Sequence, residues 1–168
     1  MSTSPVLSVK DLNVRFNTEN GVVHAVRGVN FDLYPGKTLG IVGESGSGKS
    51  VASMAIMGLL PQGGKVSSGS IILEGQDLTK MPLHLKRKMR GTKVGMIFQD
   101  PLSSLTPVYT IGDQIAEVLK VHNKGMSKQA IKDRSIELMR MVGIPSPADR
   151  LRSFPHEFSG GMRQRIMI

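Results

Sequence analysis

Apolar and polar residues alternate over the first part of the chain. Within residues 7–33, two runs at 12–16 and 29–33 carry an apolar residue at every second position. A period of two places alternate side chains on one face of a sheet, and it therefore predicts strands. Asn20-Gly21 follows the first run, and this dipeptide is typical of the tight turn of a β-hairpin. We therefore expect a hairpin at this point.

The pattern then alternates between strand and helix. Residues 38–42 form a short, continuous apolar run, which predicts a buried strand, and residues 50–60 carry apolar side chains at helical spacing. The glycine-containing stretches 63–64 and 67–69 predict loops. The pattern also predicts a turn at 34–37, strands at 70–74 and 93–98, and a helix at 82–90.

The spacing becomes helical from Ile111 onward. Ser127 stands directly before a second helical stretch and is a candidate N-cap, since its hydroxyl can accept from the first backbone amides of a helix. Gly143 follows that stretch and is a candidate C-terminal stop. The segment 107–158 is therefore predicted to be mostly helical, after a first part of mixed α/β character.

The turn between the predicted strand at 38–42 and the predicted helix at 50–60 has the pattern G-x-x-x-x-G-K-[ST]. In such a loop the backbone N–H groups surround the phosphates of a nucleotide, the lysine reaches the terminal phosphates, and the last hydroxyl ligates Mg²⁺. A flexible Gly/Ser loop is the alternative, but the strand before and the helix after favour phosphate binding. The candidate residues are Gly43, Glu44, Ser45, Gly46, Ser47, Gly48, Lys49 and Ser50.

Composition excludes some other chemistry. The chain has no cysteine, which rules out disulfides, cysteine-ligated zinc and thiol catalysis. The formal net charge is +9, and much of the excess lies in the run 86–90. Aromatic residues make up only 4% and none interrupts that run, so we expect no nucleic-acid partner. We interpret the run as a solvated helix face, with contact to anionic lipid headgroups as a lesser alternative.

A second glycine motif lies near the end of the chain. Ser159 is followed by Gly160 and Gly161, and the residues from Met162 onward have the character of a helix start. A serine and two glycines at a helix N-terminus can form an anion site. A simple helix-capping turn is the alternative.

Taken together, these motifs resemble the ATPase subunits of ABC transporters. Residues 43–50 match the Walker A motif of that family, and residues 158–162 match its signature motif, with Met162 where glutamine is more usual. Gln99 matches the glutamine of the family's Q-loop, which ligates Mg²⁺ together with Ser50. Phe16 stands where the family places an aromatic residue that stacks on adenine, although a core position in an alternating strand explains it nearly as well.

The resemblance implies a fold, a ligand and partners. It implies an α/β P-loop core with an N-terminal antiparallel β subdomain and a helical subdomain, binding ATP and Mg²⁺. Residues 98–107 and 159–165 further resemble the di- and oligopeptide importers. In that group a paired ATPase subunit places its signature motif against the other's ATP. The pair sits peripherally at the cytoplasmic face of the inner membrane, with two membrane-spanning permease subunits and an extracytoplasmic peptide-binding protein. A nickel or glutathione importer and a soluble, non-transport ABC ATPase are the alternatives.

The resemblance also sets an expectation about the end of the sequence. In the family, a strand ending in Asp-Glu follows the signature helix and supplies groups for Mg²⁺ and for the attacking water, whereas this sequence ends at Ile168. We therefore expect a C-terminally truncated chain without catalytic residues that does not hydrolyse ATP. The expected divisions are residues 1–106 for the β subdomain and phosphate loop, 107–158 for the helical subdomain, and 159–168 for the signature.

Overall fold

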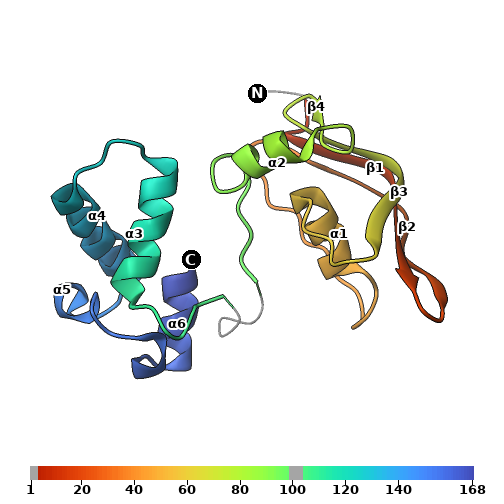
Figure 1. The fold of residues 1–168 in the computed structure, drawn as a ribbon. Coiled ribbons are helices and arrows are strands. Elements are labelled where there is room, and N and C mark those ends of the chain that lie inside the picture. The colour runs from red at the N-terminus through yellow and green to blue at the C-terminus, as the bar shows by residue number, and fades with distance from the viewer. Residues whose placement is uncertain (1–3, 99–103) are drawn as a thin grey trace. The chain divides into compact units, whose positions relative to one another are not determined.

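The computed structural model describes residues 4–98 and 104–168. Contacts within the chain divide it into two compact units, residues 1–94 and 95–168 (Figure 1). The first unit contains the sheet, and the second is helical. The three divisions expected from the sequence stay a prediction.

The first unit is built on an antiparallel sheet of four strands. Their order is β2-β1-β3-β4, with β1 at Leu7–Thr18, β2 at Gly21–Leu33, β3 at Gly64–Leu73 and β4 at Gln76–Asp77. Strands β1 and β2 pair down to Thr18 and Gly21, so the predicted hairpin is confirmed.

Helix α1, Lys49–Met57, packs against one face of this sheet (Figure 1). Its buried Ala52 and Ala55 contact the sheet's apolar side chains, and the small alanine side chains allow a close approach. Full burial of a valine or leucine side chain contributes about 1.5–3 kcal/mol. The short helix α2, Leu83–Met89, follows β4. The sheet residues of this core are Val9, Leu12, Val14, Val26, Ile71 and Leu73.

The loops predicted at 63–64 and 67–69 are wrong for most of their length, because β3 begins at Gly64. Gly69 of this strand lies beside an irregularity in the neighbouring strand β1. The register of β1 against β3 shifts between Lys10 and Asn13. At that shift Gly69 has φ +91°, and a Cβ there would lie 2.3 Å from the carbonyl oxygen of Asp11. A glycine inside a strand thus marks the close approach of another backbone.

The strands predicted at 38–42 and 93–98 are also wrong. Residues 38–42 have no strand partner among the described residues, and neither have 93–98 beyond a single bridge between Arg90 and Val94. The side chain of Val42 is 97% exposed. An apolar run becomes a strand only where another strand completes its hydrogen bonds, and no described residue does so here.

The second unit is a small helical cluster. Its elements are α3 at Ile111–His122, α4 at Lys128–Met141, α5 at Pro147–Arg150, the 3₁₀ turn η1 at Pro155–Glu157, and α6 at Gly160–Met167. The Ser127 hydroxyl accepts from the amide of Ala130 at 3.1 Å, which confirms the predicted N-cap.

The core of this unit lies between α3, α4 and α6. Its buried residues are Ile111, Met139, Ile144, Leu151 and Phe158. Phe158 is 3% exposed, so the residue that leads into the second glycine motif is anchored in this core. None of the helices in the described residues has the length and apolar character needed to cross a bilayer.

Candidate nucleotide-binding site

Helix α1 begins without a side-chain cap. Its N-cap is Gly48, in the left-handed conformation at φ 93°, whereas the N-caps of α3, α4 and α6 are Thr110, Ser127 and Ser159, whose hydroxyls accept backbone amides. Because glycine offers no acceptor, the first amides of α1 stay free for another partner. Among the described residues, the amides of Lys49 and Ser50 have no acceptor.

Gly48 is also required sterically. A Cβ at this position would lie 2.5 Å from the carbonyl oxygen of Ala25, which belongs to β2. The loop therefore lies directly against the edge of the sheet core, near buried Val26. Gly46 also has a positive φ, +80°, but a Cβ there would meet nothing within 4 Å. Both glycines let the loop bend, and Gly48 additionally lets it approach the sheet.

The Lys49 side chain folds back over its own loop. Its ammonium group donates to the carbonyl oxygens of Gly43 and Glu44, both at 2.7 Å, and to the hydroxyl of Ser47 at 3.3 Å. The cation thus lies inside the ring formed by the loop. It is held by neutral oxygens, and none of the described carboxylates pairs with it, so it is available to an anion.

The remaining loop residues are open to solvent. Glu44, Ser45 and Ser50 are exposed, and the Ser50 hydroxyl has no hydrogen-bond partner among the described residues. The free amides, the Lys49 cation and this free hydroxyl together form a set of donors, with one oxygen available for a hard metal ion. All of the predicted residues 43–50 are thus brought together.

Phe16 lies on β1, opposite Val23 of β2 and Gly64 of β3. Its ring covers Gly64, where a Cβ would lie 2.5 Å from the ring's Cε1. The side chain is half-buried and packs against the core of the first unit. This placement is compatible with both alternatives drawn from the sequence, so its stacking role stays a prediction.

The second glycine motif lies in the second unit. The Ser159 hydroxyl accepts from the amide of Met162 at 3.3 Å, so the residue caps α6, which begins at Gly160 rather than at Met162. Ser159, Gly160 and Gly161 are exposed, and a Cβ on either glycine would meet nothing within 4 Å. A capping hydroxyl keeps its own proton to donate, so capping and anion binding are compatible. Gln99 lies outside the described residues.

One arginine has a structural role that the sequence pattern does not indicate. The sequence predicts that Arg90 lies on a solvated basic face, but its guanidinium donates to the carbonyl oxygens of Met57 and Gly58 at 2.9 and 2.5 Å. It therefore caps the C-terminal end of the phosphate-loop helix α1. Cations are favoured there because the last carbonyls of a helix have no internal partner. No local pattern in the sequence distinguishes this arginine from its neighbours.

The fold is that of an ATP-binding cassette. A solved dimeric cassette, described as a post-hydrolysis state bound to ADP and Pi, superposes with a TM-score of 0.82 at 24% identity, over 96% of this chain and 66% of that one. A component of an ABC transporter complex from Clostridium perfringens superposes with a TM-score of 0.71 at 24% identity, over 97% and 59%. Likeness at this level of identity establishes the fold.

Sequence similarity establishes the family. Residues 26–168 match the family described as ABC transporter, and the chain belongs to it. It is 52% identical over 164 residues to the dipeptide transport ATP-binding protein DppD of Bacillus subtilis, covering 97% of this chain and 49% of the relative. It is 54% identical over 164 residues to the oligopeptide transport ATP-binding protein OppD of the same organism, covering 97% and 46%. Against OppD of Escherichia coli it is 48% identical over 163 residues, covering 97% and 48%. The chain thus spans about half the length of these relatives.

Proposed function

We propose that this chain is the nucleotide-binding part of an ATPase subunit that powers the import of di- or oligopeptides. The observation that carries the proposal is the loop 43–50, where an uncapped helix start and the Lys49 ammonium group form one set of donors. The names of the relatives, which are about half identical to this chain, support peptides as the transported substrate.

The loop residues fit a nucleoside triphosphate with Mg²⁺. The amides at the start of α1 would bind phosphate oxygens, and Lys49 would exchange one of its carbonyl contacts for the terminal phosphates. The Ser50 hydroxyl and Gln99 would hold the metal, which supplies additional positive charge at the phosphates. Phe16 would stack on the base. Binding at this site is thus a competition between phosphate and the loop's own carbonyls for a single cation.

The partner proposal follows from the exposed signature. Ser159, Gly160 and Gly161 would contact the ATP held by a paired ATPase subunit, and the pair would drive two permease subunits supplied by an extracytoplasmic peptide-binding protein. The subunit would then work at the cytoplasmic face of the inner membrane. If uptake of peptides proved independent of this subunit, the proposed function would change to transport of nickel or glutathione, or to a role outside transport.

The test at the loop is a titration of the purified chain with a fluorescent ATP analogue and Mg²⁺. Lys49→Ala should weaken binding about tenfold or more, because a charge-assisted contact is worth about 1.5–3 kcal/mol. Lys37→Ala removes an exposed lysine outside the motif and is the matched control. Equal affinities for Lys49→Ala and the control would refute nucleotide binding by this loop.

The test of the substrate needs cells. Uptake of labelled dipeptide should be lost when Lys49→Ala is introduced into the chromosomal gene that encodes this sequence. Uptake of nickel and of glutathione, measured in parallel, should be unchanged. Loss of nickel or glutathione uptake with normal peptide uptake would replace the substrate and leave the nucleotide site in place.

A further inference from the structure

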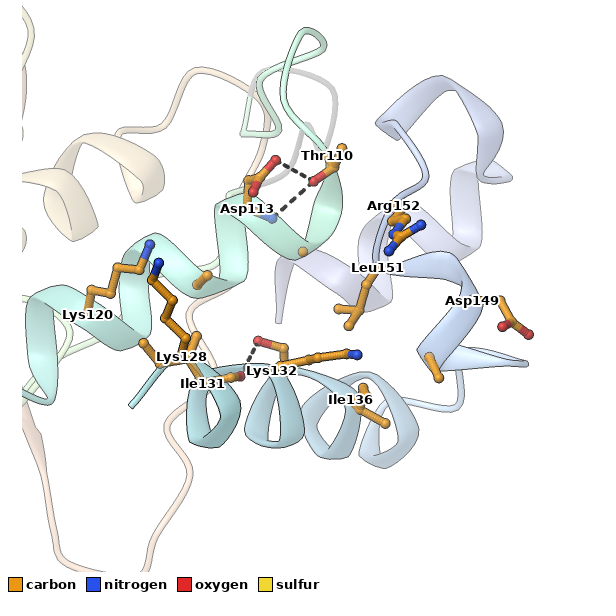
Figure 2. A pocket seen from close by; sticks show the side chains of 14 residues that line it. Thr110, Asp113, Lys120, Lys128, Ile131, Lys132, Ile136, Asp149, Leu151 and Arg152 are labelled. Carbon is orange, nitrogen blue, oxygen red and sulfur yellow. Dashed lines mark hydrogen bonds between the residues drawn. The ribbon is translucent and has the colours of Figure 1, made fainter. Parts of the chain in front are cut away.

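An open groove lies in the second unit, away from both glycine motifs in sequence. It runs between α3 and α4, is bordered by α5, and has a volume of about 830 Å³ (Figure 2). Small-molecule sites in proteins have volumes of roughly 300–1,000 Å³. The proposed function at the loop 43–50 does not use this groove.

Small residues create the hollow. Gly112 and Ala116 of α3 face it, as do Ser135 of α4 and Ala148 of α5. Ser135 is buried, and its hydroxyl donates to the carbonyl oxygen of Ile131 at 2.8 Å. The floor is therefore largely apolar, and its one buried hydroxyl is already hydrogen-bonded.

The wall beside α3 is held by backbone contacts. The amide of Gly112 donates to the carbonyl oxygen of Leu151 at 2.8 Å, and the amide of Ile111 donates to that of Ser153 at 2.9 Å. A Cβ on Gly112 would lie 2.6 Å from the Leu151 oxygen, so only glycine allows this approach. Backbone contacts thus fix this wall of the groove.

Four cations border the groove, namely Lys120, Lys128, Lys132 and Arg152. Over the described parts of the chain, 4–98 and 104–168, none of these four side chains forms an ion pair or hydrogen bond. Lys132 points into the groove in Figure 2.

Two carboxylates also border the groove and do not neutralise these cations. Asp113 accepts from the Thr110 hydroxyl at 2.6 Å as part of the cap of α3. Asp149 points away from the groove in Figure 2. The positive charge at the rim is therefore available to a ligand.

We propose that this groove binds a phosphate ester that carries an apolar portion, either a soluble metabolite or the headgroup of an anionic lipid. The lysine ammonium groups are compact charges suited to phosphate, and the apolar floor suits a hydrocarbon portion. The described residues that line the groove include no aromatic side chain, so a stacked base is not favoured. The volume of about 830 Å³ favours a small ligand over a protein partner, whose interface would require a far larger surface.

The experiment uses the full chain with Lys49→Ala in the background, which removes the phosphate loop as a competing site. The soluble probe is hexyl phosphate, measured by calorimetry, and the lipid probe is phosphatidylglycerol vesicles, compared with phosphatidylcholine vesicles. Lys128→Gln combined with Lys132→Gln should weaken binding about tenfold, since each exposed charge contributes modestly. The control pair, Lys65→Gln with Arg140→Gln, makes the same change in net charge on exposed residues outside the groove.

A steric variant separates a site from a general positive potential. Ala148 is exposed, so Ala148→Leu adds volume at the groove without disturbing a buried position, and it should weaken binding without any change in charge. Binding by hexyl phosphate identifies a soluble ligand, and binding by the anionic vesicles alone identifies a lipid headgroup.

Three results would overturn the proposal. These are no binding in either arm, equal weakening by the groove pair and the control pair, or binding of hexaglutamate in place of both phosphate probes. The last result would assign the groove to an acidic peptide. Because Lys49 is absent throughout, none of these results bears on nucleotide binding at the loop.

Discussion

Gly48→Ala tests whether the phosphate loop depends on its close approach to the sheet. The glycine has φ 93°, and its substituted Cβ would lie 2.5 Å from the carbonyl oxygen of Ala25. The left-handed conformation costs an L-residue about 1–2 kcal/mol. Overlap with a backbone atom adds about 1–3 kcal/mol, which is typical of overpacking. The free energy of unfolding should therefore fall by about 2–5 kcal/mol.

Gly46→Ala is the matched control for this prediction. Its φ is +80°, but a Cβ there would meet nothing within 4 Å, so only the conformational cost of about 1–2 kcal/mol applies. Both variants should be measured by urea unfolding and by titration with an ATP analogue. Gly48→Ala should bind at least tenfold more weakly than Gly46→Ala, because the start of α1 must move. Equal losses of stability and affinity for the two variants would refute the steric argument.

Three further changes have defined outcomes. Arg90→Met leaves the carbonyls at the end of α1 without their cation and should lower the free energy of unfolding by about 1–3 kcal/mol, measured by urea unfolding; an unchanged midpoint would contradict the capping role. The Thr79 hydroxyl donates to a carboxylate oxygen of Asp77 at 2.7 Å and holds the pKa of that carboxyl below its usual value. The carboxylate therefore stabilises the fold above its unfolded pKa. This stabilisation is lost as pH falls through the lowered folded pKa. Thr79→Val should raise the pKa of Asp77 in an NMR titration, and an unshifted titration would contradict this cause. Ser159→Arg in the full-length protein should block ATP-dependent pairing in sedimentation while ATP binding persists; loss of both would mean that the signature acts within its own subunit.

Local signals in the sequence predicted those elements that are completed locally. The alternation around Asn20-Gly21 predicted the hairpin because both strands lie next to each other in the chain. Ser127 predicted the start of α4 because the cap and the amide that it accepts are three residues apart. The loop 43–50 is recognisable for the same reason, since its candidate residues form a single short run, and its role in binding phosphate stays a prediction.

Features that depend on distant partners could not be predicted. Gly69 in β3 reads as a loop glycine until the backbone of Asp11 is placed beside it. Residues 38–42 have the apolar pattern of a strand, but strand pairing requires a second segment, which no described residue supplies. Arg90 has the same local pattern as the exposed residues beside it, and only the position of α1 distinguishes its role. Pairing and long-range capping are properties of the fold, not of the local pattern.

The Arg165 guanidinium of α6 donates to the carbonyl oxygens of Val142 and Gly143, at 3.3 and 2.7 Å, where α4 ends. The helix that Ser159 caps and the helix that carries Lys128 are thus joined by a polar contact as well as by a common apolar core. Both bonds come from the one nitrogen Nη1, so a single exposed side chain of α6 satisfies carbonyls that the end of α4 leaves without an internal partner. If ligands bind at the signature and in the groove as proposed, each would act on one of two helices joined by this contact, and any coupling between the two sites would be equal in both directions.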